Sequence, residues 1–384
     1  MGAPMTMTPR LPEVAWVLPE ESTDLSRSRF LGCMLGGAVG DALGAPVEFM
    51  HLEEIRGRFG RQGIKDYLRA YGRVGAITDD TQMTLFTAEG LLRGWVRGQL
   101  KGITSYQSVV AHAYLRWLNT QGIKPICEMI PDADGWLYGL PELQHQRAPR
   151  VTCLKALRDM KSLGEAARNN SKSCGGVMRV APVGLFAWHS RQAAETPILA
   201  FDLAAELAAI THGHPTGQLA AGVFAVLVLG LSSGASLDES LEVATACLKF
   251  RPKHEETLHA LEHARQLAKS RLPVTDAIAE LGEGWVAEEA LAISVYCAQV
   301  AISFEQGVAF AVNHSGDSDS TGAMTGSLLG AKFGMTAVPA HWLDPLELKE
   351  AIAELAEDLF AYPAWNLDAE TGAASTIHKK YPGC

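Results

Sequence analysis

Residues 32–44 read GCMLGGAVGDALG, and residues 322–334 read GAMTGSLLGAKFG. In both stretches glycine recurs at every fourth position, which places the four glycines of each stretch on one face of a helix. Glycine inside a soluble helix costs about 1 kcal/mol relative to alanine, so a stripe of four indicates that another backbone packs closely against that face. We therefore expect two glycine-striped helices at the centre of the fold.

The rest of the sequence, from Phe30 onward, is rich in Ala, Leu and Gly and contains no series of alternating strand segments. Helical spacing recurs in segments 202–210, 216–231, 240–250, 256–269 and 288–304. We predict an all-α fold, a compact single domain over residues 28–365, with an irregular N-terminal arm (1–27) and a C-terminal tail (366–384). Prolines predict a loop-rich insertion at residues 122–168, which is expected to rim a cleft.

Composition excludes several classes of protein. The formal net charge is −10 and no Lys/Arg run occurs, which argues against a nucleic-acid partner. Seven cysteines without a CxxC pair fit neither a disulfide framework nor a zinc site, so we expect a reducing cytoplasm. The N-terminus has no secretory pattern. The longest apolar run, residues 219–231, is shorter than the roughly 20 residues of a membrane span and is predicted as a buried helix.

Two acidic motifs each precede a predicted helix. Residues 78–81 read TDDT and residues 316–322 read GDSDSTG. Each motif alone is typical of helix capping, because Thr and Asp in a first turn accept hydrogen bonds from free N–H groups. Capping needs only one or two side chains per helix, however, and these motifs together offer four carboxylates and several hydroxyls. Without a cation such carboxylates would repel one another, so we predict a site for two Mg²⁺ or Mn²⁺ ions, which prefer oxygen ligands.

The acidic motifs and three further segments resemble the ADP-ribosylglycohydrolase family, whose founding member is the dinitrogenase reductase activating glycohydrolase. In chain order the five segments are residues 40–49 (GDALGAPVEF), 77–83 (ITDDTQM), 175–182 (GGVMRVAP), 211–215 (THGHP) and 316–323 (GDSDSTGA). The resemblance extends from about residue 30 to about residue 360. It implies an orthogonal helical bundle of the ADP-ribosylglycohydrolase type with a binuclear metal centre.

The resemblance also assigns roles to individual residues. It implies that the metal ligands are Thr78, Asp79, Asp80, Asp317, Asp319 and Ser320. Glu48 matches a carboxylate that in some relatives faces the ribose and acts in acid/base catalysis, although a glutamate there is equally a solvated or helix-starting residue. Asp317 is expected to share the catalytic work by stabilising positive charge near the sugar.

A Gly-Gly turn is expected to bind the pyrophosphate, because bare N–H groups at such a turn can hold phosphate oxygens. The predicted substrate-binding residues are Ser173, Cys174, Gly175, Gly176, Met178 and His214. The family often has Asn where this chain has Cys174, which is a departure from the pattern. Arg179 is either a phosphate partner or a structural residue, and the pair His212 and His214 more often caps or packs at a helix start than binds metal.

The expected activity is metal-dependent removal of ADP-ribose from a modified protein, most simply from arginine. The motifs specify the sugar and not the leaving group, so serine linkages, ADP-ribose polymers and acetylated ADP-ribose stay open as alternatives. A protein that binds ADP-ribose without turnover is a further alternative, against which the intact aspartates argue. The N-terminal arm, with its apolar cluster around Trp16, also raises the hypothesis of immunity against an ADP-ribosylating toxin whose active site the arm would enter.

Overall fold

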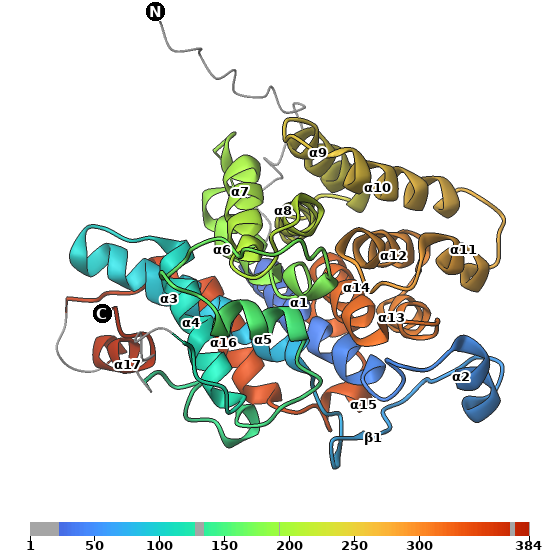
Figure 1. Ribbon diagram of the computed structural model, residues 1–384, viewed down its shortest axis with the longest axis horizontal. Coiled ribbons are helices and arrows are strands. Elements are labelled where there is room, and N and C mark those ends of the chain that lie inside the picture. Colours follow the sequence, from blue (N-terminus) through green and yellow to red (C-terminus); the bar gives the residue numbers. More distant parts are fainter. Residues whose placement is uncertain (1–22, 127–133, 192, 369–372, 384) are drawn as a thin grey trace, which may run out of the picture.

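The computed structural model describes residues 23–126, 134–191, 193–368 and 373–383. Figure 1 shows a molecule built almost wholly from helices, which confirms the all-α prediction. The helices are α1 (Thr23–Gly44), α2 (Leu52–Phe59), α3 (Asp79–Lys101), α4 (Tyr106–Thr120), α5 (Val151–Arg158), α6 (Ala181–Ala187), α7 (Thr196–Ala209), α8 (Pro215–Ser232), α9 (Leu237–Lys249), α10 (Glu255–Ala268), α11 (Val274–Leu281), α12 (Ala287–Val300), α13 (Phe304–Val312), α14 (Ser318–Phe333), α15 (Ala340–Leu343), α16 (Lys349–Ala361) and α17 (Ala373–Lys380).

One short hairpin interrupts the helical architecture. Strand β1 (Arg69–Ala70) pairs antiparallel with β2 (Arg73–Val74). The two turn residues between the strands, Tyr71 and Gly72, both have positive φ, which suits a tight hairpin turn. In the part of the chain that the structure describes, these are the strands of the only sheet.

The two glycine-striped helices pack against each other at the centre of the molecule (Figure 1). They run antiparallel, because Gly32 faces Gly330 and Gly40 faces Gly322. A Cβ atom added to Gly36 would lie 2.6 Å from the carbonyl oxygen of Gly326, too close for any residue but glycine. The predicted close approach of another backbone is therefore confirmed, and each stripe is the partner of the other.

Helix α8 runs through the core of the domain. It is the one helix among the described residues that is long and apolar enough to cross a membrane by length and composition, and 89% of that stretch is buried inside the structure. Burial on all sides explains its uniformly apolar sequence, since a helix surrounded by protein needs no polar face. The prediction of a buried helix at residues 219–231 is confirmed.

Some predicted boundaries differ from the observed ones. The helix expected at 288–304 ends at Val300, and α13 starts afresh because the hydroxyl of Ser303 accepts a hydrogen bond from the N–H of Gln306 as a helix cap. Helix α1 begins at Thr23, inside the predicted arm. The predicted insertion contains α5. Residues 1–22, with the apolar cluster around Trp16, lie outside the described residues, so the toxin hypothesis stays a prediction from sequence.

Candidate active site

The candidate site forms where the end of α1 meets the beginnings of α3 and α14. The contact between the glycine stripes places Gly44 against the backbone of Ser318, so the last turn of α1 lies beside the first turn of α14. The two acidic motifs, far apart in sequence, meet directly because the hydroxyl of Ser320 donates to Asp80 Oδ1 at 2.7 Å. The structure thus brings together the motifs that precede α3 and α14.

Asp41, on α1, organises the threonines of the first motif. Its carboxylate accepts hydrogen bonds from the Thr78 hydroxyl at 2.7 Å and from the Thr81 hydroxyl at 2.5 Å, as well as from both backbone N–H groups. Thr78 also caps α3, since its side chain accepts from the N–H of Asp80. The capping interpretation therefore holds for Thr78. Sequence reasoning missed Asp41, although a lone carboxylate among the small apolar residues of a glycine-striped helix is a signal of a buried polar partner.

The remaining acidic residues form a buried cluster. Glu48, Asp317 and Asp319 can each place one carboxylate oxygen within 4.8 Å of the others. Their side chains are at most 1% exposed. Three carboxylate oxygens of the two acidic motifs and Glu48 are buried without a hydrogen-bond partner among the described residues: Glu48 Oε2, Asp79 Oδ1 and Asp319 Oδ2. Because unpartnered buried oxygens are costly, they mark the positions where a cation would bind.

The donor set fits a hard divalent cation. The six predicted ligands lie in this region and offer only carboxylate and hydroxyl oxygens: Thr78, Asp79, Asp80, Asp317, Asp319 and Ser320. Mg²⁺ and Mn²⁺ prefer such ligands. The described cysteine nearest the cluster, Cys174, directs its thiol to Asp317 as a hydrogen-bond donor. The fit therefore supports a metal site.

Burial dominates the electrostatics of the cluster. It raises the pKa of Asp41 to about 7 and, against the opposing effect of Arg150, raises the pKa of Asp317 to about 7 and that of Asp79 to about 8. Burial together with the neighbouring Asp319 raises the pKa of Glu48 to about 10. Burial disfavours the charged form of each of these carboxyl groups, and a bound divalent ion would lower the same pKa values.

Arg150 is the one basic side chain in direct contact with the cluster among the described residues. Its Nη2 donates to Asp317 Oδ1 at 2.5 Å, to Ser320 Oγ at 2.9 Å and to Asp319 Oδ1 at 3.3 Å. Its Nη1 donates to Glu48 Oε1 at 3.2 Å. Burial disfavours this guanidinium, but the charges of Asp317 and its neighbours outweigh that effect and raise the pKa of Arg150. Sequence reasoning did not single out this residue.

The predicted pyrophosphate loop lies directly against the cluster. Cys174 begins a short 3₁₀ helix (Cys174–Gly176), and its Sγ donates to Asp317 Oδ2 at 2.7 Å. The Ser320 hydroxyl lies 3.6 Å from that sulfur and 3.7 Å from the sulfur of Met178. Cys174, Gly175 and Gly176 are all buried, so this loop lines the interior of the site.

The two histidines of the predicted motif have different positions. His212 is fully buried, and its ring nitrogens contact the hydroxyls of Ser173 at 2.9 Å and Thr211 at 2.8 Å. Burial lowers the pKa of His212 to about 3, so the ring is neutral and holds the loop by hydrogen bonding. His214 is half-buried and caps α8, because its Nδ1 accepts from the N–H of Thr216. The role of His214 in substrate binding stays a prediction.

Arg179 belongs to the core and not to the phosphate site. It is fully buried, with its guanidinium 4.3 Å from the ring centre of Tyr114. Nη2 donates to the hydroxyl of Thr211 at 2.7 Å and to the carbonyl of Leu207 at 3.1 Å. Of the two interpretations left open by the sequence, the structure therefore favours a structural residue, and within the described ranges its polar contacts are with neutral groups.

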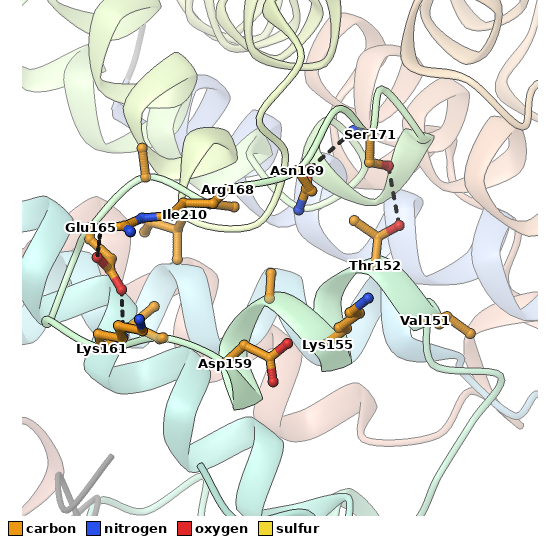
Figure 2. Close-up of a pocket in the computed structure, with 14 residues that line it drawn as sticks. Val151, Thr152, Lys155, Asp159, Lys161, Glu165, Arg168, Asn169, Ser171 and Ile210 are labelled. Carbon is orange, nitrogen blue, oxygen red and sulfur yellow. Dashed lines mark hydrogen bonds and ion pairs between the residues drawn. The ribbon is translucent and has the colours of Figure 1, made fainter. Parts of the chain in front are cut away.

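A pocket of about 370 Å³ lies beside the site (Figure 2). Val151 and Thr152, which directly follow Arg150, line one side, and Asn169 and Ser171 line another. The Thr152 and Ser171 hydroxyl oxygens lie 3.1 Å apart and form a hydrogen bond, which Figure 2 marks with a dashed line. The Ser171 hydroxyl also donates to Ser173 at 3.3 Å, which links the pocket wall to the predicted pyrophosphate loop. The predicted insertion does line this cleft.

Comparison with known proteins agrees with this geometry. Residues 22–368 match the family model for ADP-ribosylglycohydrolase. Similar curated proteins include the ADP-ribosyl-[dinitrogen reductase] glycohydrolase of Rhodospirillum rubrum, 26% identical over 84% of this chain and 91% of that protein. An ADP-ribosylarginine hydrolase of Pseudomonas putida is 24% identical over 89% of this chain and 79% of its own length. An ADP-ribosylhydrolase of Homo sapiens is 25% identical over 87% of this chain and 93% of that protein.

A solved structure has the same fold. It is described as an ADP-ribosylglycohydrolase-related protein complex, and it superimposes with a TM-score of 0.63 at 27% sequence identity. The match covers 88% of this chain and 99% of that chain. The sequence match over most of the chain, the helical fold and the buried acidic cluster all agree. The chain therefore belongs to the ADP-ribosylglycohydrolase family and is an ADP-ribosyl hydrolase.

Proposed function

We propose that this protein is a metal-dependent ADP-ribosylarginine hydrolase, which cleaves the N-glycosidic bond between ADP-ribose and an arginine side chain of a modified protein. The observation that carries the proposal is the buried cluster of Glu48, Asp317 and Asp319, in which Glu48 and Asp319 each keep an unpartnered oxygen, beside a pocket of about 370 Å³. The proposed occupants are two Mg²⁺ or Mn²⁺ ions, held by the six oxygen ligands named above.

Bound metal ions would supply Lewis-acid chemistry and a water molecule of lowered pKa. The chain's own residues would stabilise charge and exchange protons. The carboxylates of Glu48 and Asp317 face the same small volume and would stabilise the positive charge that develops on the sugar as the bond breaks. Glu48 Oε2 has no partner among the described residues, which leaves it free to exchange a proton with the substrate.

Arginine as the leaving side chain has support from the site itself. Glu48, which is not among the proposed metal ligands, contacts a guanidinium, that of Arg150, and so shows that a guanidinium can lie against its carboxylate. A departing arginine leaves as a guanidinium cation, and buried carboxylates would favour that charge. The similarity to an ADP-ribosylarginine hydrolase supports the same assignment. The serine, polymer and acetylated linkages remain the alternatives, because an ADP-ribosylhydrolase of another kind is equally similar.

The remainder of the substrate would extend from the cluster across the predicted loop. Ser173, Cys174, Gly175, Gly176, Met178 and His214 are proposed as its contacts. Ser173 and His214 each contact Ser171, a residue of the pocket wall, which supports a path from the acidic cluster into the pocket. A reducing cytoplasm is the proposed location, supported by five described cysteines that are free thiols.

The linkage is tested by offering the purified protein two substrates at equal concentration, one protein modified on arginine and one modified on serine. Released ADP-ribose is measured with Mg²⁺, with Mn²⁺, and after chelation. The proposal expects release from arginine to be at least about ten-fold faster, and to stop on chelation. Equal or faster release from serine would overturn the arginine assignment, whereas full activity after chelation would overturn the metal requirement.

A further inference from the structure

The acidic cluster contains more carboxyl groups than basic groups. Six buried carboxyl groups lie in or beside it, belonging to Asp41, Glu48, Asp79, Asp80, Asp317 and Asp319. A single guanidinium, that of Arg150, lies within 4.0 Å of four of them. The guanidinium therefore offsets only part of the negative charge, and it does so from the space that the carboxylate oxygens share.

We infer that Arg150 is an internal cation that competes with the divalent metal ion for the acidic cluster, so that metal binding requires its guanidinium to leave. The inference rests on the proposed metal site. It deepens that proposal by naming a residue of this chain that sets how strongly the site binds metal, and Arg150 is not one of the predicted ligands.

The Nη2 nitrogen of Arg150 occupies the same oxygens that a metal ion would use. This one nitrogen donates to Asp317 Oδ1, Asp319 Oδ1 and Ser320 Oγ and lies 3.8 Å from Asp80 Oδ2. All four residues are proposed metal ligands. An oxygen that accepts from the guanidinium has less negative charge to offer a metal ion, and two cations in one such space repel each other. The guanidinium and a metal ion thus exclude each other at these oxygens.

The surroundings of Arg150 provide a route out of the cluster. Its side chain is 12% exposed, whereas the carboxylates it contacts are at most 1% exposed, so Arg150 has the most exposed charged side chain of these contacts. Nε has no hydrogen-bond partner within the described residues. The ring of Trp285 lies 5.8 Å from Arg150 Cζ and is only partly buried. An arginine side chain that leaves the cluster can stay against this aromatic face, so the cation–π attraction is kept while the contacts with the carboxylates are lost.

The backbone of Arg150 is held independently of its side chain. Its N–H donates to Asp79 Oδ2 at 3.0 Å, and the residue directly precedes α5. Substitution of the side chain therefore leaves the main-chain contact with the cluster in place. A substitution at Arg150 can therefore change the charge of the side chain without changing the position of the backbone.

The test is direct titration with Mn²⁺ of the full-length protein freed of metal, followed by the paramagnetic signal of free Mn²⁺ and by calorimetry. The variants are Arg150→Gln, which removes the charge but keeps a polar stem, Arg150→Ala, and Arg150→Lys, which keeps the charge. Arg158→Gln is the matched control, since it removes one positive charge from the exposed end of α5, the helix that Arg150 precedes. Circular dichroism establishes that each variant is folded.

The inference expects Arg150→Gln and Arg150→Ala to bind Mn²⁺ at least about ten-fold more tightly than the unaltered protein. Arg150→Lys and Arg158→Gln should stay within about three-fold. Guanidinium ion at non-denaturing, millimolar concentration should weaken Mn²⁺ binding to the alanine variant and not to the unaltered protein, whereas urea, its neutral analogue, should affect neither.

Unchanged or weaker Mn²⁺ binding by both neutral variants would overturn the inference and leave the proposed function standing. Absence of Mn²⁺ binding by every protein in the set would overturn the proposed metal site and the inference with it. A gain equally large in Arg158→Gln would also overturn the inference, because general charge loss would then account for the effect.

Discussion

Gly36 and Gly326 face each other across α1 and α14 so closely that a Cβ atom on Gly36 would lie 2.6 Å from the carbonyl oxygen of Gly326. The same interface continues through Gly40 and Gly322 towards the acidic cluster, to which α1 contributes Asp41 and α14 contributes Asp319. The glycine contact therefore sets the distance between the two helices that carry the site.

The first prediction concerns this contact. Gly36→Ala should lower the free energy of unfolding by roughly 1–3 kcal/mol, because the added methyl group meets backbone atoms that cannot move aside. Gly57→Ala on α2 is the control, since a Cβ there meets nothing within 4 Å. The control should raise stability by up to about 1 kcal/mol. Urea unfolding measures both, and equal effects of the two substitutions would contradict the packing account.

A second prediction separates the two roles of His214. His214→Ala should cost about 1 kcal/mol of stability, because it removes the side chain that caps α8. His214→Asn should keep the stability, because Asn is a good helix cap. Both variants should raise KM for the ADP-ribosylated substrate several-fold if the imidazole contacts substrate as proposed. An unaltered KM in both variants would leave His214 with the capping role alone.

A third prediction follows from His189, which lies among aromatic rings and away from the acidic cluster. Burial lowers the pKa of His189 to about 4, although its Nε2 donates to the carbonyl of Leu359. Below its ordinary pKa of roughly 6.5 the unfolded chain takes up a proton that the folded chain does not, so this residue makes stability fall with decreasing pH, at most by about 1.4 kcal/mol per pH unit.

Replacement by Gln should remove that loss. The stability of His189→Gln relative to the unaltered protein should improve as the pH is lowered from 7 to 5, as measured by urea unfolding at several pH values. His259→Gln, at an exposed position on α10, is the control and should follow the unaltered protein. If the free energy of unfolding fell equally with pH in His189→Gln and in the unaltered protein, the His189 ring would not be the source of the pH dependence.

The glycine spacing of the sequence predicted two closely packed central helices, because glycine at every fourth position is required where another backbone comes close. A glycine every fourth residue has a cost that only close backbone packing offsets, so each stripe predicted that another backbone packs against it. The partner of each stripe was not predicted, since spacing says that a neighbour exists and not which one it is. The same limit applies to the helix expected at 288–304, whose apolar spacing continues across the cap at Ser303.

The metal site was predicted from the two acidic motifs, because the carboxylates and hydroxyls at two helix starts are more than capping requires. Arg150 was missed for a physical reason. An arginine in a proline-rich stretch is usually solvated, and nothing in its neighbours indicates that its guanidinium reaches Asp317, which is 167 residues away in sequence. The interpretation that His212 and His214 cap or pack at a helix start is confirmed, but the sequence does not assign the two roles because burial decides them: His212 contacts the loop, and His214, two residues later, caps a helix.

The central claim is that the buried acidic cluster performs the hydrolysis. The most direct measurement is the rate of ADP-ribose release from an arginine-modified protein by the unaltered chain and by Asp317→Asn, with Asp344→Asn, a largely exposed carboxylate, as the control. Asp317→Asn keeps the shape and removes one charge that faces Arg150 and Cys174. The account predicts a loss of at least about 100-fold in kcat for Asp317→Asn and an unchanged rate for the control. A folded Asp317→Asn variant that released ADP-ribose at the original rate would contradict it.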